Sequence, residues 1–207
     1  MYDVRPNLIL GFHGCDEATC QSLLNFPDKI KISKEKHDWL GHGMYFWENN
    51  LERALDWAKD KKKRGEVEKP AVIGAILQLG YCCDFLDSRF IKMLKSHHEL
   101  MADYYNALGE DLPLNKDLKQ DTYKDKILRE LDCTTIEFMH GQIDEQIMID
   151  IAKTCFSQLR PFDTTRGVFT EGGPVFPGAG ILEKNHIQIC IRNLNCIKGL
   201  FLPRKEI

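Results

Sequence analysis

Several features that mark common functional classes are missing from these 207 residues. No apolar run approaches the roughly 18–20 residues that a membrane-spanning helix needs. The opening segment lacks the basic stretch and the long apolar run of a secretory signal peptide. Neither a CxxC pair nor the Cys/His spacing of a zinc site occurs. We therefore expect no signal peptide, no membrane partner and no metal site.

Strong charge of either sign is also missing, because 28 basic side chains nearly balance 31 acidic ones and give a net charge of −3. No global field draws such a protein to nucleic acid or to anionic membranes. This balance does not exclude a local basic patch at 61–64 or at Arg192, Lys198 and Arg204. Eight cysteines are present, and those in apolar runs, such as Cys190, have the surroundings of buried free thiols. The sequence therefore predicts a reduced, cytoplasmic protein.

Hydrophobic spacing and turn residues divide the chain into strands and helices. Strands are predicted at Leu8–Phe12, Met44–Trp47, Ala71–Leu79, 186–193 and 196–203, and helices at Glu17–Asn25, Leu51–Arg64, 88–108 and about 121–160, with Asp16 and either Asn49 or Asn50 as N-caps. The segment CCDFLD at 82–87 is expected to continue the strand Ala71–Leu79 or to pair with it. A loop rich in glycine and proline is expected at Gly167–Gly180. We predict one α+β domain over residues 1–207, with a helical insertion at about 88–160.

The segment Phe12-His13-Gly14 places a histidine and a glycine directly after a predicted buried strand. A strand end holds a polar side chain rigidly, and a glycine lets a ligand approach the backbone. The alternative interpretation is a turn histidine beside a glycine that only ends the strand. Taken alone, the segment favours this alternative.

The stretch Asp38–Asn50, DWLGHGMYFWENN, combines two glycines with four aromatic residues. Gly41 and Gly43 free the backbone before a short strand, and alternation along that strand predicts Tyr45 and Trp47 on one face. One face of the strand would fill the core, and the other would form an aromatic wall. A tyrosine in such a wall can stack on a flat apolar group while its hydroxyl stays solvated. The alternative is a hydrophobic strand entered through a glycine turn.

The late strand 186–193 alternates isoleucines with His186 and Gln188, which places these two polar side chains on one face. The preceding loop carries Phe169 and Phe176, which we expect to be exposed and able to contact a ligand. The alternative for Gln188 is a polar residue on a half-buried strand. The alternative for the loop is a plain connection, although its roughly 14 residues exceed the usual length.

The order of these motifs resembles the ADP-ribosyltransferase superfamily, and more narrowly its poly(ADP-ribose)-polymerase and diphtheria-toxin branch. The matching segments are FHG, then GMYF followed by ERALDWA, and a late strand with an inward polar residue. They cover about 8–80 and 165–203 but not the middle helical region. The resemblance implies a split β-sandwich around an NAD⁺ cleft. That fold lacks the GxGxxG fingerprint of dinucleotide-binding domains, which is also missing from this sequence.

The resemblance also implies roles for individual residues. His13 would hydrogen-bond a ribose hydroxyl of NAD⁺, and the backbone of Gly14 would hold the nicotinamide carboxamide. Tyr45 would stack on the nicotinamide ring. Gly43 would let the cofactor lie close, and Phe46 is counted with the cofactor-binding residues, although it is also a candidate for the core.

The third position of the family motif departs from the family pattern. Where the family usually has a glutamate that binds the 2′-hydroxyl of the nicotinamide ribose, this sequence has Gln188, with His186 two residues earlier on the same face. Glutamine keeps the hydrogen bond but brings no negative charge. Glu171 in the glycine-rich loop and Glu183 before the strand are the alternative carboxylates. The expected catalytic residues are therefore His13, Tyr45, Gln188 and Glu171.

The activity implied by the resemblance is transfer of ADP-ribose from NAD⁺ to a macromolecular acceptor, either nucleic acid or protein. Without the glutamate we expect single transfer rather than polymer elongation. At the level of the family, the resemblance together with the compact size and cytosolic character suits a bacterial toxin of a toxin–antitoxin or antiviral defence system, with an antitoxin as partner. Three alternatives stay open: a catalytically silent module that binds NAD⁺, ADP-ribose or a partner protein, an NAD⁺-dependent RNA 2′-phosphotransferase, and a scaffold without a ligand.

Overall fold

The computed structural model describes residues 8–119 and 121–204. Most of the opening segment, in which no signal peptide is expected, lies outside the described residues. In chain order the elements are β1 (Ile9–Asp16), α1 (Glu17–Asn25), the 3₁₀ turn η1 (Pro27–Lys29), β2 (Met44–Glu48), α2 (Leu51–Lys63), β3 (Pro70–Leu77), β4 (Cys82–Asp84), α3 (Ser88–Leu108), β5 (Asn115–Lys116), β6 (Leu128–Arg129), α4 (Glu130–Thr154), β7 (Thr164–Phe169), β8 (His186–Ile191), the 3₁₀ turn η2 (Leu194–Cys196) and β9 (Ile197–Phe201). The fold is therefore mixed α+β, as predicted.

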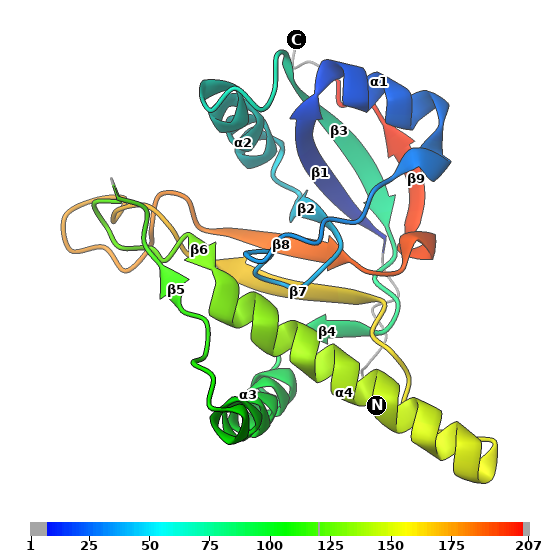
Figure 1. The fold of residues 1–207 in the computed structure, drawn as a ribbon. Coiled ribbons are helices and arrows are strands. Elements are labelled where there is room, and N and C mark those ends of the chain that lie inside the picture. Colours follow the sequence, from blue (N-terminus) through cyan, green and yellow to red (C-terminus); the bar gives the residue numbers. More distant parts are fainter. Residues whose placement is uncertain (1–7, 120, 205–207) are drawn as a thin grey trace.

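Seven strands form one sheet in the order β4-β7-β8-β2-β1-β3-β9. Neighbouring strands run antiparallel, except β4 and β7, which are parallel. In Figure 1, β1, β3 and β9 rise steeply in the upper part of the molecule, whereas β4, β7 and β8 lie across the view below them. The sheet therefore consists of two groups of strands that differ in direction, and β2 lies between them.

The two groups are joined by a short pairing between β1 and β2. Its register aligns Gly11 with Glu48 and Phe12 with Trp47. By contrast, β1 pairs with β3 along its whole length, and β2 pairs with β8. Beyond Phe12, β1 and β2 therefore separate. β1 stays paired with β3, and β2 stays paired with β8. Backbone groups that lose a strand partner need another one, so this junction is where side chains or ligands can supply hydrogen bonds.

Helices cover both faces of the upper strands (Figure 1). α1 packs on the face that carries the main core, where Phe46 and Ile73 are fully buried. α2 packs on the other face, against Phe12 and Trp47. Apolar residues at helical spacing form the buried stripe of α2, and the side chain of Asn50 caps its first turn. Of the two alternatives predicted for this cap, Asn50 is therefore the one that the structure shows, and Asp16 caps α1 as predicted.

α3 and α4 form the helical region predicted between the two motif-bearing parts. They pack on each other and on the β4 end of the sheet, where Cys83, Met139 and Phe162 are buried in a second core cluster. Figure 1 shows the C-terminal half of α4 projecting beyond the sheet. No helix within residues 8–119 and 121–204 is long and apolar enough to cross a membrane.

The second long helix begins at Glu130, later than the predicted 121. The Asp121 carboxylate accepts hydrogen bonds from the amides of Tyr123, Lys124 and Asp125, and Lys124 has a positive φ of 56°. Side chain-to-backbone bonds of this kind stabilise a turn in competition with a helix. The hydrophobic pattern alone therefore placed the helix start too early.

Three strand predictions also need correction. β1 continues to Asp16, so His13 lies inside the strand and not after its end. β7 includes Gly167–Phe169, which the composition assigned to the loop. β4 pairs with β7 rather than with the strand that precedes it. In each case a partner strand distant in the sequence decides the structure, and local composition does not contain that information.

Candidate functional site

His13 bridges the two groups of strands at the point where they separate. Its Nδ1 lies 2.7 Å from the carbonyl oxygen of Tyr45. Because a carbonyl oxygen only accepts, Nδ1 carries the ring proton and donates it. Burial lowers the pKa of His13 to about 4, so at neutral pH the ring is uncharged and Nε2 keeps a lone pair. His13 thus supplies the hydrogen bond that strand separation removes, and it presents an acceptor on its other nitrogen.

Three of the expected cofactor-binding residues serve packing in the structure. A Cβ on Gly14 would overlap the carbonyl oxygen of Ala54 in α2, and a Cβ on Gly43 would overlap Cys190 in β8. These glycines therefore permit close contact between neighbouring elements. Phe46 is fully buried in the main core and has no surface for a ligand, so the expectation that it binds the cofactor is corrected.

Tyr45 and Gln188 lie on the same face of the sheet. The register between β2 and β8 pairs Tyr45 with Cys190 and Trp47 with Gln188, and paired residues of neighbouring strands point to the same side. Gln188 is 8% exposed, and its Oε1 accepts a hydrogen bond of 2.5 Å from the indole Nε1 of Trp39. The amide that stands at the third motif position is therefore covered by an indole ring.

The segment 39–43 also covers the hydroxyl of Tyr45. This hydroxyl accepts a hydrogen bond from the amide of Leu40 and donates one to the carbonyl oxygen of Gly41, both at 2.8 Å. Burial raises the pKa of Tyr45 well above its usual value. The hydroxyl is therefore neutral and fully used within the protein, contrary to the solvated hydroxyl expected from the sequence.

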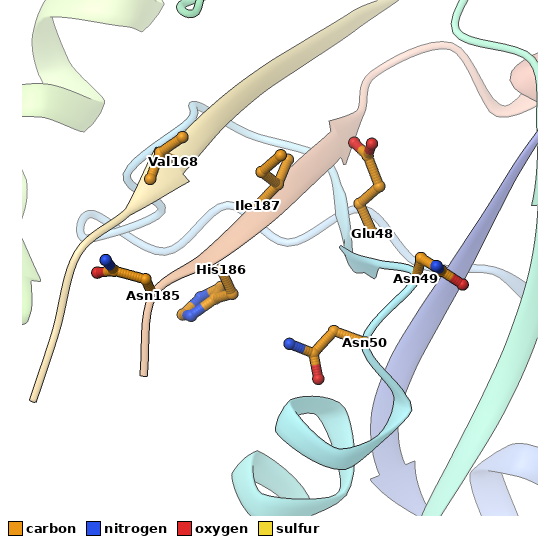
Figure 2. A pocket seen from close by; sticks show the side chains of 7 residues that line it. All are labelled: Glu48, Asn49, Asn50, Val168, Asn185, His186 and Ile187. Carbon is orange, nitrogen blue, oxygen red and sulfur yellow. The ribbon is translucent and has the colours of Figure 1, made fainter. Parts of the chain in front are cut away.

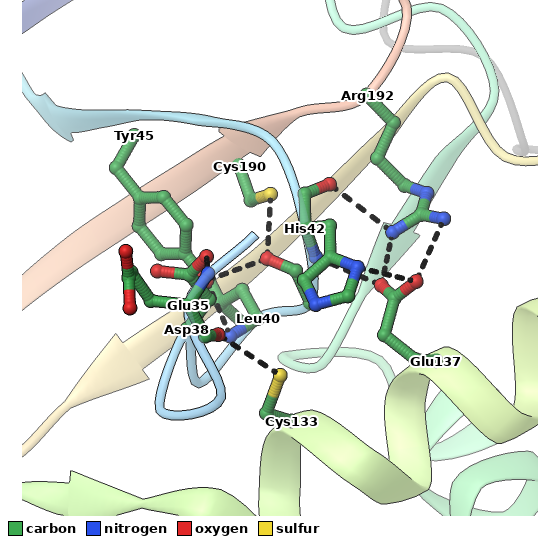
Figure 3. A network of polar contacts seen from close by, with 10 residues as sticks. Glu35, Asp38, Leu40, His42, Tyr45, Cys133, Glu137, Cys190 and Arg192 are labelled. Atoms are coloured by element: carbon green, nitrogen blue, oxygen red, sulfur yellow. Dashed lines mark hydrogen bonds and ion pairs between the residues drawn. The ribbon is translucent and has the colours of Figure 1, made fainter. Parts of the chain in front are cut away.

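Helix α4 holds the segment 39–43 in place (Figure 3). The Glu137 carboxylate accepts hydrogen bonds from the His42 amide, at 2.8 Å, and from the Arg192 guanidinium. Its other oxygen lies 3.2 Å from Nδ1 of His42. Although burial acts to raise it, the pKa of Glu137 is lowered by Arg192 and the His42 amide. His42 therefore has a structural role, which is to tie the segment to α4.

Five aromatic rings form a row on the face that carries Tyr45 and Gln188. Successive ring centroids lie between 5.2 and 6.1 Å apart in the order Trp39, Phe169, His186, Trp47, Trp57. We call these five residues the aromatic row. The Arg129 guanidinium lies 3.7 Å from the centroid of Phe169, and Arg64 lies 5.0 Å from that of Trp57. The row therefore carries a cation near each end.

Phe169 and Phe176 differ from each other in exposure. Phe169 is 6% exposed and belongs to the aromatic row, which corrects the expectation of an exposed ring. Phe176 is 62% exposed, as expected, in the loop between β7 and β8. Hydrogen bonds pair Val175 with Ile181 and Gly173 with Glu183 within this loop. The loop is thus folded back on itself and presents Phe176 near its tip.

A cavity of about 400 Å³ lies beside the aromatic row (Figure 2). Its lining residues are Glu48, Asn49, Asn50, Val168, Asn185, His186 and Ile187. It lies where β2 ends and α2 begins, close to the strand junction. Nε2 of His186, on its lining, and Trp47 Nε1 and Arg53 Nε, on β2 and α2, are buried without a hydrogen-bond partner among the described residues. Such atoms are rare in folded proteins and point to a bound water or ligand group.

The two candidate carboxylates are placed differently. Glu171 forms an ion pair with Arg53 of α2, and both side chains are mostly buried, at 14% and 13% exposed. Burial raises the pKa of Glu171 above its ordinary value. Glu183 is exposed in the loop before β8. The ion pair with Arg53 therefore holds Glu171 near the aromatic row, whereas Glu183 lies on the surface.

A buried ion cluster on the other face was not found from the sequence. The Arg166 guanidinium donates to both oxygens of Glu48, at 2.6 and 3.0 Å, and to both oxygens of Asp84, at 3.2 and 3.1 Å. Arg166 is 8% exposed and Asp84 is 2% exposed. Glu48 also lines the cavity. The cluster ties β4 and β7 to β2 and fixes one wall of the cavity.

A sequence signal for this cluster exists. Arg166 and Glu48 lie within or at the end of short apolar strands, TTRGVF and MYFWE, where a charged side chain must find a partner. Trp39, Arg53 and Arg129 carry no such signal, because none of them lies in or at the end of a strand predicted from the sequence.

No family model, no curated protein and no solved structure matches this chain. Within the described part of the chain, no three or more His, Cys, Asp or Glu side chains gather as a metal-binding group.

Proposed function

We propose that this protein is an NAD⁺-dependent ADP-ribosyltransferase that makes single transfers to a macromolecular acceptor. The observation that carries the proposal is His13, a neutral, partly buried histidine that replaces strand pairing at the junction of the sheet and keeps Nε2 as an acceptor. Tyr45 and Gln188, the other two motif positions, lie on adjacent strands β2 and β8 and share a face. Three motif positions far apart in the chain thus fall on three consecutive strands.

In this proposal the two groups of strands are the two parts of a split β-sandwich, and NAD⁺ binds at their junction. His13 Nε2 accepts a hydrogen bond from a ribose hydroxyl, and the ring of Tyr45 stacks on the nicotinamide. The Gln188 amide binds the nicotinamide ribose. Its lack of charge favours modest turnover, because one electrostatic stabiliser of a transition state contributes about 10²–10³ in rate.

The covered state of Tyr45 and Gln188 adds a requirement to this proposal. The indole of Trp39 donates a hydrogen bond to the amide oxygen of Gln188, and backbone groups of the segment 39–43 hydrogen-bond the Tyr45 hydroxyl. NAD⁺ therefore binds after the segment moves away, as active-site loops do in many enzymes. Glu171 stays available as the negative charge that Gln188 lacks, because Arg53 can pair with a ligand phosphate in place of the Glu171 carboxylate.

A silent NAD⁺- or ADP-ribose-binding module is the second candidate, and the Trp39–Gln188 contact favours it because that contact blocks the third motif position. The toxin role and an antitoxin partner belong to the first candidate and rest on the resemblance. Release of nicotinamide separates the two candidates, since only an enzyme consumes NAD⁺.

The test is incubation of the purified protein with NAD⁺ labelled in its adenylate part, together with cell lysate, RNA or DNA. We expect nicotinamide release and label on one class of polymer. His13→Asn keeps a donor for the Tyr45 carbonyl but lacks Nε2, and we expect it to lose 10²-fold or more of the activity, on the order of one lost transition-state contact. Calorimetry with NAD⁺ shows whether binding is lost too.

His97→Asn is the matched control. His97 also places Nδ1 against a backbone carbonyl, that of Met93 at 2.8 Å, but it lies on α3. We expect this variant to keep the wild-type rate. Binding of NAD⁺ without nicotinamide release would favour the silent module. If the wild-type protein neither binds NAD⁺ nor labels any polymer, both candidates are wrong.

A further inference from the structure

The three unpartnered atoms beside the aromatic row have complementary requirements. Trp47 Nε1 and Arg53 Nε each carry a hydrogen and can only donate. His186 Nε2 is an acceptor, because Nδ1 of the same ring lies 2.7 Å from the carbonyl oxygen of Lys184 and therefore carries the ring proton. His186 is 7% exposed, and its ring lies between those of Phe169 and Trp47 in the aromatic row. Its orientation is therefore fixed.

A hydroxyl group between Trp47 and His186, whose ring centroids lie 6.1 Å apart, meets the requirements of both rings. Its oxygen accepts from an indole or guanidinium N–H, and its hydrogen is donated to the imidazole. A carbonyl or a carboxylate would pair with the two donors and leave His186 unpaired, and an ammonium group would pair with His186 alone. His186 also lines the cavity of about 400 Å³, a volume within the range of small-molecule sites. The ligand chemistry that the cluster fits is therefore that of a hydroxyl.

We propose that this cluster receives the attacking hydroxyl of the acceptor and that His186 Nε2 takes its proton, an inference that rests on the proposed ADP-ribosyl transfer. The hydroxyl oxygen forms a bond to the anomeric carbon of the nicotinamide ribose. The bond from that carbon to the nicotinamide nitrogen breaks, and its electron pair leaves with neutral nicotinamide. The hydroxyl proton passes to His186, which becomes an imidazolium and then releases the proton to solvent.

The charges around His186 fit this role. Arg53 of α2 and Arg129 of β6 act on it as cations, and Glu171 is paired with Arg53. Burial first, and these cations second, lower the pKa of His186 to about 4. The imidazole is therefore unprotonated at neutral pH. A base of this strength accepts a proton once the hydroxyl oxygen has begun to bond to the sugar carbon and has become acidic.

The test uses methanol as the acceptor, because it supplies a hydroxyl without a polymer. The product, methyl ADP-riboside, is measured by mass spectrometry beside nicotinamide release. His186→Asn keeps a donor for the Lys184 carbonyl and lacks Nε2. We expect it to lower product formation by about 10²–10⁴-fold, as for a lost general base, while NAD⁺ affinity stays within about threefold. His186→Gly with added imidazole tests the base directly, and we expect partial recovery of the rate.

His140→Asn is the control, because His140 on α4 is also 5% exposed and has an unpartnered Nε2. We expect it to leave the rate unchanged. Undiminished formation of methyl ADP-riboside by His186→Asn, or a preference of the wild-type protein for methylamine over methanol, overturns this inference while the proposed function stands. No NAD⁺ consumption by the wild-type protein overturns the proposed function itself. With lysate, ribonuclease or protease treatment of the labelled product shows whether RNA or protein supplies the hydroxyl.

Discussion

At the scale of single residues, Arg166 of β7 links its strand to β2 and β4 through buried ion pairs. It is buried and forms two-oxygen contacts with both Glu48 and Asp84. A planar guanidinium suits this geometry, and lysine does not reproduce it. Removing one partner of a buried ion cluster is costly because the remaining charges stay buried without compensation. Arg166 is therefore expected to act on stability and on the cavity wall together.

Arg166→Met should lower the free energy of unfolding by about 3–5 kcal/mol, since two carboxylates lose their arginine in the interior. Urea denaturation followed by circular dichroism measures the change. Arg64→Ala is the control, because Arg64 pairs with Glu66 at the surface, where both side chains are about half exposed. An exposed pair contributes about 0–1 kcal/mol. Equal losses in the two variants would mean that the buried cluster has no special role.

At the scale of elements, the segment 39–43 depends on α4 for its position. Glu137 holds both the His42 amide and Arg192, and Arg192 also donates to the His42 carbonyl at 3.2 Å. The segment in turn covers Tyr45 and Gln188. The helical region between the motif-bearing parts is therefore linked to the site by a few charged hydrogen bonds, and it does more than fill space.

Glu137→Gln should release the segment 39–43. Hydrogen bonds to a charged group contribute about 1.5–3 kcal/mol, which corresponds to roughly 10–100-fold faster amide exchange in a locally opening segment. Hydrogen–deuterium exchange with peptide mass spectrometry measures this. Glu145→Gln on the exposed side of the same helix is the control. Unchanged protection of 39–43 in Glu137→Gln would show that α4 does not hold the segment.

At the scale of the whole molecule, the fold keeps three histidines neutral. Burial is the main cause that lowers the pKa of His13 to about 4, of His140 to about 3 and of His186 to about 4. An unfolded chain binds protons at these positions below about pH 6.5. The contribution of these three histidines to stability is therefore fully present above pH 6.5. It is lost as the pH falls from there toward 4, because the unfolded state takes up more protons than the folded state.

The free energy of unfolding should decline between pH 6.5 and 4.5 with a slope of up to about 4 kcal/mol per pH unit, which corresponds to three protons. Urea titrations at several pH values measure the slope. His140→Met removes one buried imidazole away from the motif positions and should reduce the slope by about 1.4 kcal/mol per unit. A wild-type stability that is flat across this range would contradict the assignment of neutral buried histidines.

Local sequence patterns predicted where the strands and helices lie better than they predicted which strands pair with each other. Alternating isoleucines identified β8, and Asp16 and Asn50 marked the starts of α1 and α2. β7 was partly missed because its glycine and its buried arginine resemble loop residues. Pairing of β4 with β7, and the bend between β1 and β2, depend on contacts between distant segments, which no local pattern encodes.

The sequence proposed positions for a site but did not indicate which residues cover them in the fold. His13 and Gln188 were named from the motif order, and the structure places them on the strands around β2. Their surroundings, such as Trp39 on Gln188, come from the folding of the segment 39–43 over the sheet. Glycine and aromatic content indicated a special segment there, but the direction in which it folds depends on Glu137, 95 residues beyond His42.

The aromatic row has a consequence for spectroscopy. The chain contains three tryptophans, and Trp39, Trp47 and Trp57 are all members of the row. Indole emission responds to nearby charges and to solvent, and each of these rings has a cation, a histidine or another ring beside it. The intrinsic fluorescence of the protein is therefore a label-free optical report on this one surface, and events at the far end of α4 are spectrally silent.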